Sequence, residues 1–143
     1  MSQQLRSATE AGIDGLAGTA QPVGEEFVRA LAGKDGAALR AVLADPIDFA
    51  ALTPGRHWTA SSSDEVIVEI MLGRWFDARS EILGIEALGG GVLPGREHVS
   101  YRLRVRRSDG DYLVEQQAYY NTDGGRISWL RVLCSGYNKT NPR

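Results

Sequence analysis

The sequence has no long apolar run, no pair of cysteines and no large excess of charge. No run approaches the ~18 apolar residues that cross a bilayer, and the start, MSQQLRSATEAG, does not show the basic and then apolar pattern of a secretory signal. The single cysteine, Cys134, excludes an intramolecular disulfide. A net charge of −2 argues against a nucleic acid or an anionic membrane as partner. We therefore expect a soluble cytoplasmic protein.

Motifs for metals, nucleotides and RNA are also missing. His57 and His98 are far apart in the sequence, and with one cysteine they give no zinc spacing. The segment GGGVLPG precedes a predicted strand, whereas a phosphate-binding loop opens a helix. The arginines between positions 102 and 107 have acidic neighbours, which is typical of a solvated face. We expect neither a metal nor a cofactor.

The chain is long enough for one domain with its own core. A chain of 143 residues buries about two-thirds of its unfolded surface when it folds. Residues 1–20 have few large apolar side chains and predict a flexible tail. Residues 138–143 are polar and predict a loose end. The folded domain is therefore expected over residues 21–137.

Two amphipathic helices are predicted at the start of this domain. The first covers residues 22–32 and carries Phe27 and Leu31 one turn apart. The second begins after Asp35, a suitable capping residue, and ends at Pro46.

A change of pattern follows the second helix. Residues 47–52 and 56–60 predict two short extended pieces around a turn. Ser62 and Glu65 then form a capping box, which predicts a third helix to about Phe76. Its expected core positions are Val66, Ile67, Ile70, Met71 and Trp75.

The second half of the chain predicts four strands, with helices collected in front of them. A strand over residues 80–88 is followed by three long strands between residues 96 and 137, joined by two tight turns. A turn at residues 109–110 places Leu103 opposite Gln116, so that both side chains lie on the inner face. On the outer face the same register pairs Arg104 with Glu115 and Arg102 with Gln117. This order predicts an α+β fold.

A second turn, at residues 123–124, predicts the faces of the last strand. It places Gln116 opposite Arg131 and Ala118 opposite Trp129. The inner face then carries polar tips among apolar walls, as small-molecule pockets do. These predicted ligand-binding residues are Gln116, Tyr120, Trp129 and Arg131, with Tyr101 beside them. Cys134, Leu130 and Val132 would lie on the outer face, where a second subunit would cover them.

The chain resembles the nuclear transport factor 2-like superfamily, which includes SnoaL-like polyketide cyclases, ketosteroid isomerases and scytalone dehydratases. The resemblance covers residues 22–137 and rests on the opening helix and on the segments GKDGAALRAVLADPIDF and DGGRISWLRVL. It implies a cystatin-like cone, in which three N-terminal helices pack on a strongly curved antiparallel sheet around a conical cavity. It also implies a homodimer.

The catalytic residues of ketosteroid isomerases do not carry over well. Their carboxylate base would fall near residues 50–51, where this chain has two alanines. Their second acid, on the penultimate strand, corresponds to Gln116, which can donate a hydrogen bond but cannot titrate.

Two residues near the predicted mouth are candidates for proton transfer. His57 could shuttle a proton, or it could simply be a surface histidine. Asp45 could act as a base, or it could cap a turn beside Pro46. Trp58 could cover an apolar ligand, or it could simply pack beside a surface histidine.

Other candidates lie on the predicted inner face. Tyr101, with Gln116, could hold a developing oxyanion, although sheet tyrosines usually only pack. Arg131 could orient the substrate, or it could pair with Asp45 or Asp48. Cys134 is interpreted as a packed side chain.

The prediction is a protein that binds a small, largely apolar molecule with a polar or anionic group in a conical pocket. If it is an enzyme, it is a cofactor-independent isomerase, cyclase or dehydratase with His57, Asp45 and Tyr101 in catalysis. The alternative is a non-catalytic binding or dimerisation module of the same fold.

Overall fold

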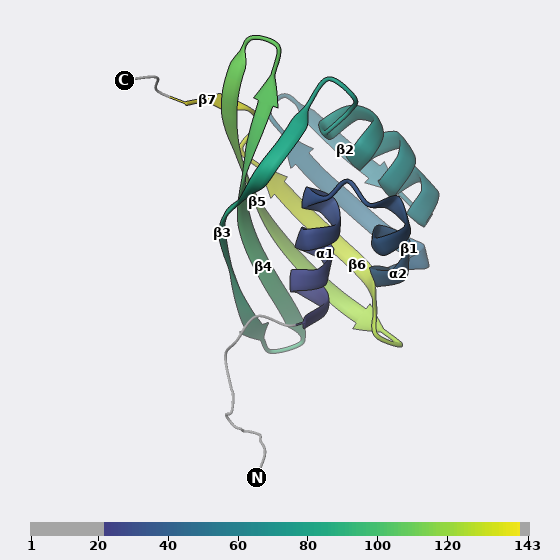
Figure 1. Ribbon diagram of the computed structural model, residues 1–143. Helices are drawn as coiled ribbons and strands as arrows, with labels where there is room; N and C mark the ends of the chain where they lie inside the picture. Colours follow the sequence, from purple (N-terminus) through teal and green to yellow (C-terminus); the bar gives the residue numbers. More distant parts are fainter. Residues whose placement is uncertain (1–21, 141–143) are drawn as a thin grey trace.

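The computed structural model describes residues 22–140, which form three helices and one sheet (Figure 1). The predicted tail, residues 1–20, lies outside the described residues. In chain order the elements are α1 (Pro22–Ala32), α2 (Gly36–Val42), β1 (Leu43–Thr53), β2 (Arg56–Ala60), the helix η1 (Glu65–Trp75), β3 (Glu81–Leu93), β4 (Arg96–Arg107), β5 (Gly110–Asp123), β6 (Arg126–Cys134) and β7 (Asn138–Lys139).

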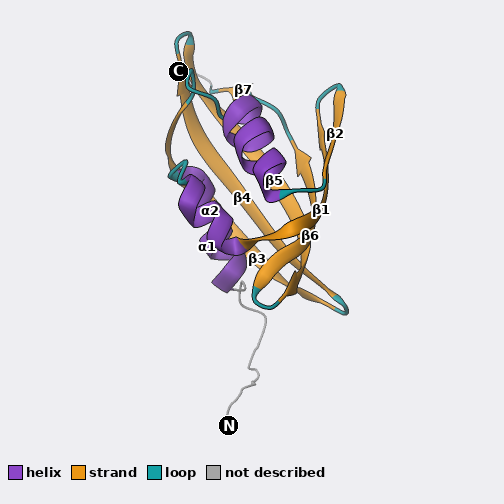
Figure 2. Ribbon diagram, turned by 90° about the vertical axis from the view of Figure 1, so that its right-hand side faces the viewer, coloured by secondary structure: helices purple, strands orange, loops and turns teal. Residues whose placement is uncertain are grey.

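The strands form a single curved sheet with the order β2-β1-β6-β5-β4-β3, and β7 pairs with β5. Neighbouring strands are antiparallel except β1 and β6, which run parallel. The three helices gather on the concave face of the sheet (Figure 2). There α1 packs against β3 and β4, and α2 packs against β1, β6 and η1. The predicted α+β cone is confirmed. Within residues 22–140, no helix is long and apolar enough to cross a membrane.

The first helix follows its sequence pattern closely. Its bounds are those predicted, and Phe27 and Leu31 are fully buried. The Phe27 ring meets the Tyr101 ring edge-on, with 6.1 Å between the centroids. Each such side chain contributes about 1.5–3 kcal/mol by leaving water.

The second helix starts as predicted but ends early. The Asp35 carboxylate accepts a hydrogen bond from the Ala38 amide at 3.0 Å. The helix stops at Val42 rather than Pro46, because Leu43 already pairs with Ile127 of β6. Tertiary strand pairing therefore overrides a local helical preference.

The third helix, η1, is wider than an α-helix. The predicted capping box is present: the Glu65 amide donates to Ser62 Oγ at 3.2 Å. All five predicted core positions are buried. At the other end, the Phe76 amide donates to the Met71 carbonyl, five residues back, at 2.8 Å. A π-type turn of this kind is uncommon and places Trp75 and Phe76 at the open end of the cone.

The β4–β5 hairpin differs from its predicted register by two positions. Tyr101 lies opposite Gln116, and Arg102 lies opposite Glu115 and forms an ion pair with it at 2.8 Å. The connection uses residues 108–109. A shift of two residues leaves every side chain on its predicted face, because strand side chains alternate with a period of two.

The predicted register of β6 was wrong, and most of its side chains point to the opposite face of the sheet from the one predicted. The Gly124–Gly125 turn starts the pairing, with Thr122 opposite Ile127, but the next pair is Asn121 with Trp129. Ser128 is therefore the extra residue of a β-bulge. Beyond the bulge, the residues that point inward are Leu130, Val132 and Cys134, and those that point outward are Trp129, Arg131 and Leu133.

The structure contains more strand residues than the sequence predicted, in two places. Strand β3 continues to Leu93, so residues 89–93 of the predicted GGGVLPG loop belong to the sheet. Asn138 and Lys139, predicted in a loose end, pair with β5. The last residues, 141–143, lie outside the described residues.

The close contact between α1 and the sheet generates a first prediction. A Cβ atom at Gly24 would lie 2.4 Å from Tyr120 Oη. We expect Gly24→Ala to lower the free energy of unfolding by about 1–3 kcal/mol through overpacking, measured by urea denaturation. In a Tyr120→Phe background the same substitution should cost clearly less. Gly36→Ala, which meets no atom within 4 Å, is the control. Equal costs in both backgrounds would contradict the contact.

Candidate functional site

A cavity of about 280 Å³ opens at the wide end of the cone. Its walls come from the β1–β2 turn, the end of η1, β5, β6 and the segment after β6. The lining residues are Thr53, Pro54, Arg74, Trp75, Phe76, Val114, Gln116, Cys134, Gly136 and Tyr137. Pro54 and Arg74 are exposed at the rim, whereas Phe76, Val114 and Gln116 are buried. The cavity therefore has an open mouth and an inner end closed off from water.

A row of three side chains crosses the sheet at the inner end of the cavity. Tyr101 of β4, Gln116 of β5 and Cys134 of β6 are register partners on the inner face. The Tyr101 hydroxyl donates to Gln116 Oε1 at 2.6 Å, and both side chains are almost fully buried. This bond fixes the amide and leaves Nε2 as its available donor.

Two buried donors in the cavity wall have no hydrogen-bond partner among residues 22–140. They are Gln116 Nε2 and the indole Nε1 of Trp75. A buried donor without an acceptor costs about 1–3 kcal/mol. Neither nitrogen is exposed to solvent, so an acceptor oxygen from a ligand or a water molecule would reach them only after a small movement of the wall, and would then restore this free energy.

Tyr137 ties the end of the chain to η1 beside the cavity. Its hydroxyl donates to the Trp75 carbonyl at 2.5 Å and lies 3.2 Å from Ser80 Oγ. The rings of Phe76 and Tyr137 are in contact, with 6.2 Å between centroids. Tyr137 therefore holds the position of the helix end that carries the Trp75 indole.

Burial governs the ionisation of the tyrosines near the cavity. Burial raises the pKa of Tyr101 well above its ordinary value, and the nearby Cys134 raises it further. The pKa of Tyr137 is raised mainly by burial, with smaller raising contributions from Asp77 and Cys134. Both phenols therefore stay neutral in the folded protein at ordinary pH.

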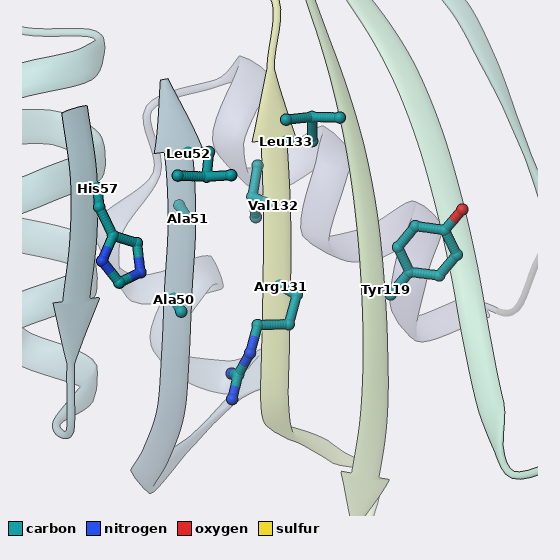
Figure 3. Close-up of a pocket in the computed structure, with 8 residues that line it drawn as sticks. All are labelled: Ala50, Ala51, Leu52, His57, Tyr119, Arg131, Val132 and Leu133. Atoms are coloured by element: carbon teal, nitrogen blue, oxygen red, sulfur yellow. The ribbon is translucent and has the colours of Figure 1, made fainter. Parts of the chain in front are cut away.

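The residues predicted to transfer protons are not part of this cavity. His57 is exposed and lines a shallow groove on the outer face of the sheet, together with Leu52, Arg131 and Leu133 (Figure 3). Asp45 is also exposed, and its carboxylate accepts a hydrogen bond from the Ser63 amide at 3.2 Å. The structure thus gives Asp45 a capping contact and separates both residues from Tyr101.

Among the predicted ligand-binding residues, Gln116 lines the cavity and Trp58 stands behind its wall. The Trp58 indole donates to Thr53 Oγ1 at 2.8 Å and meets the Trp75 ring edge-on. Tyr120 is buried elsewhere on the inner face, against Gly24 of α1.

Trp129 and Arg131 lie on the outer face, contrary to the prediction that they point inward. The Arg131 guanidinium pairs with the Asp48 carboxylate at 3.0 Å and stacks over the Trp129 ring. Arg96 stacks on the same ring, 3.7 Å from its centroid. The bulge at Ser128 turned both residues outward, so neither reaches the cavity. Asp48, one of the two expected partners of Arg131, pairs with it at the surface.

Several cavity residues were not recognised from the sequence, among them Trp75, Cys134 and Tyr137. Trp75 was predicted only as a core position, Cys134 as an outer side chain, and Tyr137 as the end of the domain. Trp75 gave no signal of a cavity, because its place in the helix pattern is that of an ordinary core residue, and it is indeed buried. Cys134 gave none, since its face depends on the bulge. Over residues 22–140, no group of three or more His, Cys, Asp or Glu side chains could hold a metal ion.

Comparisons with known proteins show the fold and leave the activity open. No family model matches the chain, and no curated protein matches its sequence. Solved structures do match. A protein of ketosteroid isomerase-like fold from Catenulispora acidiphila, in complex with trimethylamine, has a TM-score of 0.61 at 14% identity and covers 82% of this chain and 88% of its own.

Two further solved structures support the same fold. An LEH-like epoxide hydrolase from M. tuberculosis has a TM-score of 0.58 at 16% identity, covering 79% of this chain and 80% of its own. A candidate SnoaL-like polyketide cyclase from Mesorhizobium loti has a TM-score of 0.59 at 16% identity, covering 77% and 94%. The chain has the nuclear transport factor 2-like fold, and the predicted resemblance is confirmed at that level.

The buried pair of Tyr101 and Gln116 generates a second prediction. At pH 8, Tyr101→Phe should lower the free energy of unfolding by about 1–3 kcal/mol, because Gln116 Oε1 loses its donor. The raised pKa keeps Tyr101 neutral when folded, so its contribution is complete below pH ~10 and is lost as the pH rises further. That loss, about 1.4 kcal/mol per pH unit, affects only the wild type.

The deficit of Tyr101→Phe should therefore shrink between pH 10 and 11 in urea denaturation. Tyr119→Phe, at a side chain 39% exposed, is the control and should change stability by less than about 0.5 kcal/mol. A deficit that stays constant over this pH range would contradict the assignment.

Proposed function

We propose that the cavity beside Gln116 binds a small, largely apolar molecule through one hydrogen-bond acceptor, and that the protein is a ligand-binding module. The observation that carries this proposal is the pair of unpartnered buried donors, Gln116 Nε2 and Trp75 Nε1, in a largely apolar wall. Pockets for small molecules have this character: apolar walls with a few placed polar groups. A volume of about 280 Å³ suits a small ligand.

The chemistry of the donors indicates the class of ligand. Both are neutral N–H groups, so they suit a ketone, aldehyde or ester oxygen. Arg74 at the rim could pair with an anionic group that remains near water. The ligand is therefore a small carbonyl compound with an apolar body.

A cofactor-independent isomerase, cyclase or dehydratase is the second candidate. It is supported by the fold shared with an epoxide hydrolase-like protein. However, the described lining includes neither a histidine nor a carboxylate, and the titratable groups that could move a proton there are those of Cys134 and Tyr137. The binding function fits this lining better.

The outer face of the sheet is proposed as a homodimer interface. The sequence predicted this interface from Leu130 and Val132, but both of these side chains point inward. Other apolar side chains stand there instead: Leu52, Tyr119 and Leu133 are 52%, 39% and 57% exposed and line one groove (Figure 3). A two-fold symmetric pairing would cover this patch on both copies.

Ligand binding is tested with acetophenone and ethylbenzene, which have similar shapes but differ in the carbonyl group. We expect acetophenone to bind about tenfold more tightly, the effect of one good hydrogen bond. It should shift the Gln116 side-chain amide and Trp75 indole signals in ¹H–¹⁵N NMR spectra. Trp75→Phe should weaken acetophenone binding, whereas Trp129→Phe, on the outer face, should not. Equal affinities for the two compounds would reject the proposed acceptor recognition.

The dimer is tested by sedimentation velocity across a range of protein concentrations. We expect a dimer in the wild type and a monomer for Leu133→Glu, because removing a carboxylate from water into an apolar interface costs free energy. Val68→Glu, at an equally exposed apolar position on η1, is the control and should remain a dimer. A monomeric wild type would refute the proposal.

A further inference from the structure

Cys134, the only cysteine of the chain, lies in the cavity wall. It was expected to pack on the outer face, but the bulge at Ser128 turns it inward. Its side chain is half-buried, and the Gly136 amide donates to its sulfur at 3.4 Å. Pro54 and Arg74, at the rim of the same cavity, are exposed to solvent.

The thiol has a donor directly across the sheet. Cys134 and Gln116 are register partners, so their Cβ atoms are about 4.5–5.5 Å apart. Gln116 is fully buried, its Oε1 accepts from Tyr101, and its Nε2 has no partner within residues 22–140. One strand thus presents a nucleophile. The next strand presents an N–H group of an amide whose oxygen is fixed by the hydrogen bond from Tyr101.

We propose that Cys134 is a covalent capture site for small α,β-unsaturated carbonyl compounds. In such a compound the electrophilic carbon lies three bonds from the carbonyl oxygen, which suits a thiol and an N–H donor on facing residues. With the oxygen accepting from Gln116 Nε2, the β-carbon lies next to the sulfur. This inference rests on the proposed function, because it uses the same cavity and the same acceptor recognition.

The reaction is a conjugate addition that needs no further reagent. The thiol loses its proton to water, and the sulfur electron pair forms a bond to the β-carbon. The electrons of the carbon–carbon double bond move toward the carbonyl, giving an enolate whose oxygen accepts from Gln116 Nε2. The α-carbon then takes a proton from water. The net change is addition of S–H across the double bond, with no oxidation or reduction.

The Tyr101–Gln116 bond has a defined part in this site. The amide is already fixed before the ligand arrives, so little ordering is needed when charge develops on the oxygen. Tyr101 touches neither sulfur nor ligand in this arrangement and acts as a positioning residue. Trp75 Nε1, the other buried donor of the described wall that has no partner, is available to the same oxygen or to a second acceptor.

The test uses the full-length protein with 2-cyclohexen-1-one, followed by intact-mass spectrometry. Iodoacetamide serves as a reference electrophile, because its alkylation leaves no enolate to stabilise. We expect one adduct, at Cys134, and a ratio of cyclohexenone to iodoacetamide rates at least about tenfold higher than for glutathione. Cys134→Ser should give no adduct. A ratio equal to that of glutathione would overturn the proposal.

The donor is tested with the double variant Gln116→Leu/Tyr101→Phe, which removes both hydrogen-bonding partners and so avoids an orphaned hydroxyl. Its rate ratio should fall about tenfold, toward that of glutathione. Gln117→Leu, at the neighbouring glutamine that contacts His98 on the outer face, is the control and should keep the wild-type ratio. An unchanged ratio in the double variant would also refute the assignment of Gln116.

Failure of this inference can be told apart from failure of the proposed function. If acetophenone binds with the expected carbonyl preference but cyclohexenone shows no enhanced addition, the capture site is rejected and the binding function stands. If acetophenone shows no carbonyl preference either, both are rejected.

Discussion

The β-bulge at Ser128 determines which side chains of β6 meet the interior of the cone. Because strand side chains alternate, one extra residue reverses the faces of all residues after it. Cys134 thereby comes to lie opposite Gln116, and Arg131 moves to the outer face, where Asp48 neutralises it. A buried arginine would have needed an anion inside the cavity. Because no arginine is buried there, the inner end of the cavity has mainly apolar walls, and its hydrogen-bond donors are neutral.

The cavity combines a rigid floor with donors that lack acceptors. Tyr101 fixes the Gln116 amide from one side, and Tyr137 fixes the helix end that carries Trp75. Around them, the fully buried core of α1 and the sheet supplies the stability that two unsatisfied donors reduce. Such a balance is typical of binding sites, in which part of the folding free energy is given up so that recognition groups stand ready.

Much of the fold could be predicted from local patterns. The bounds of α1 and β2, the Asp35 cap, the capping box of η1 and its five buried positions all followed from neighbouring residues in the sequence. Predictions failed where a distant partner decided the outcome. Helix α2 gave way to strand pairing with β6, and β3 extended through glycines because β4 was there to pair with them. Of the candidate site, Gln116 and Tyr101 were correctly predicted on the inner face, but their pairing was not, because the register of the hairpin differs by two residues.

By itself, the sequence determined the α+β class, the order of the elements and the inner face of β4 and β5, because each depends on a short-range period or cap. Only the tertiary structure decided the face of β6, the isolation of His57 and Asp45 from the cavity, and the presence of Cys134 in its wall. The physical reason is that a bulge depends on how well two strands and the layer beneath them fit together. The free energy that a bulge costs and the free energy that it gains depend on residues far apart in the chain, so no local sequence pattern predicts it.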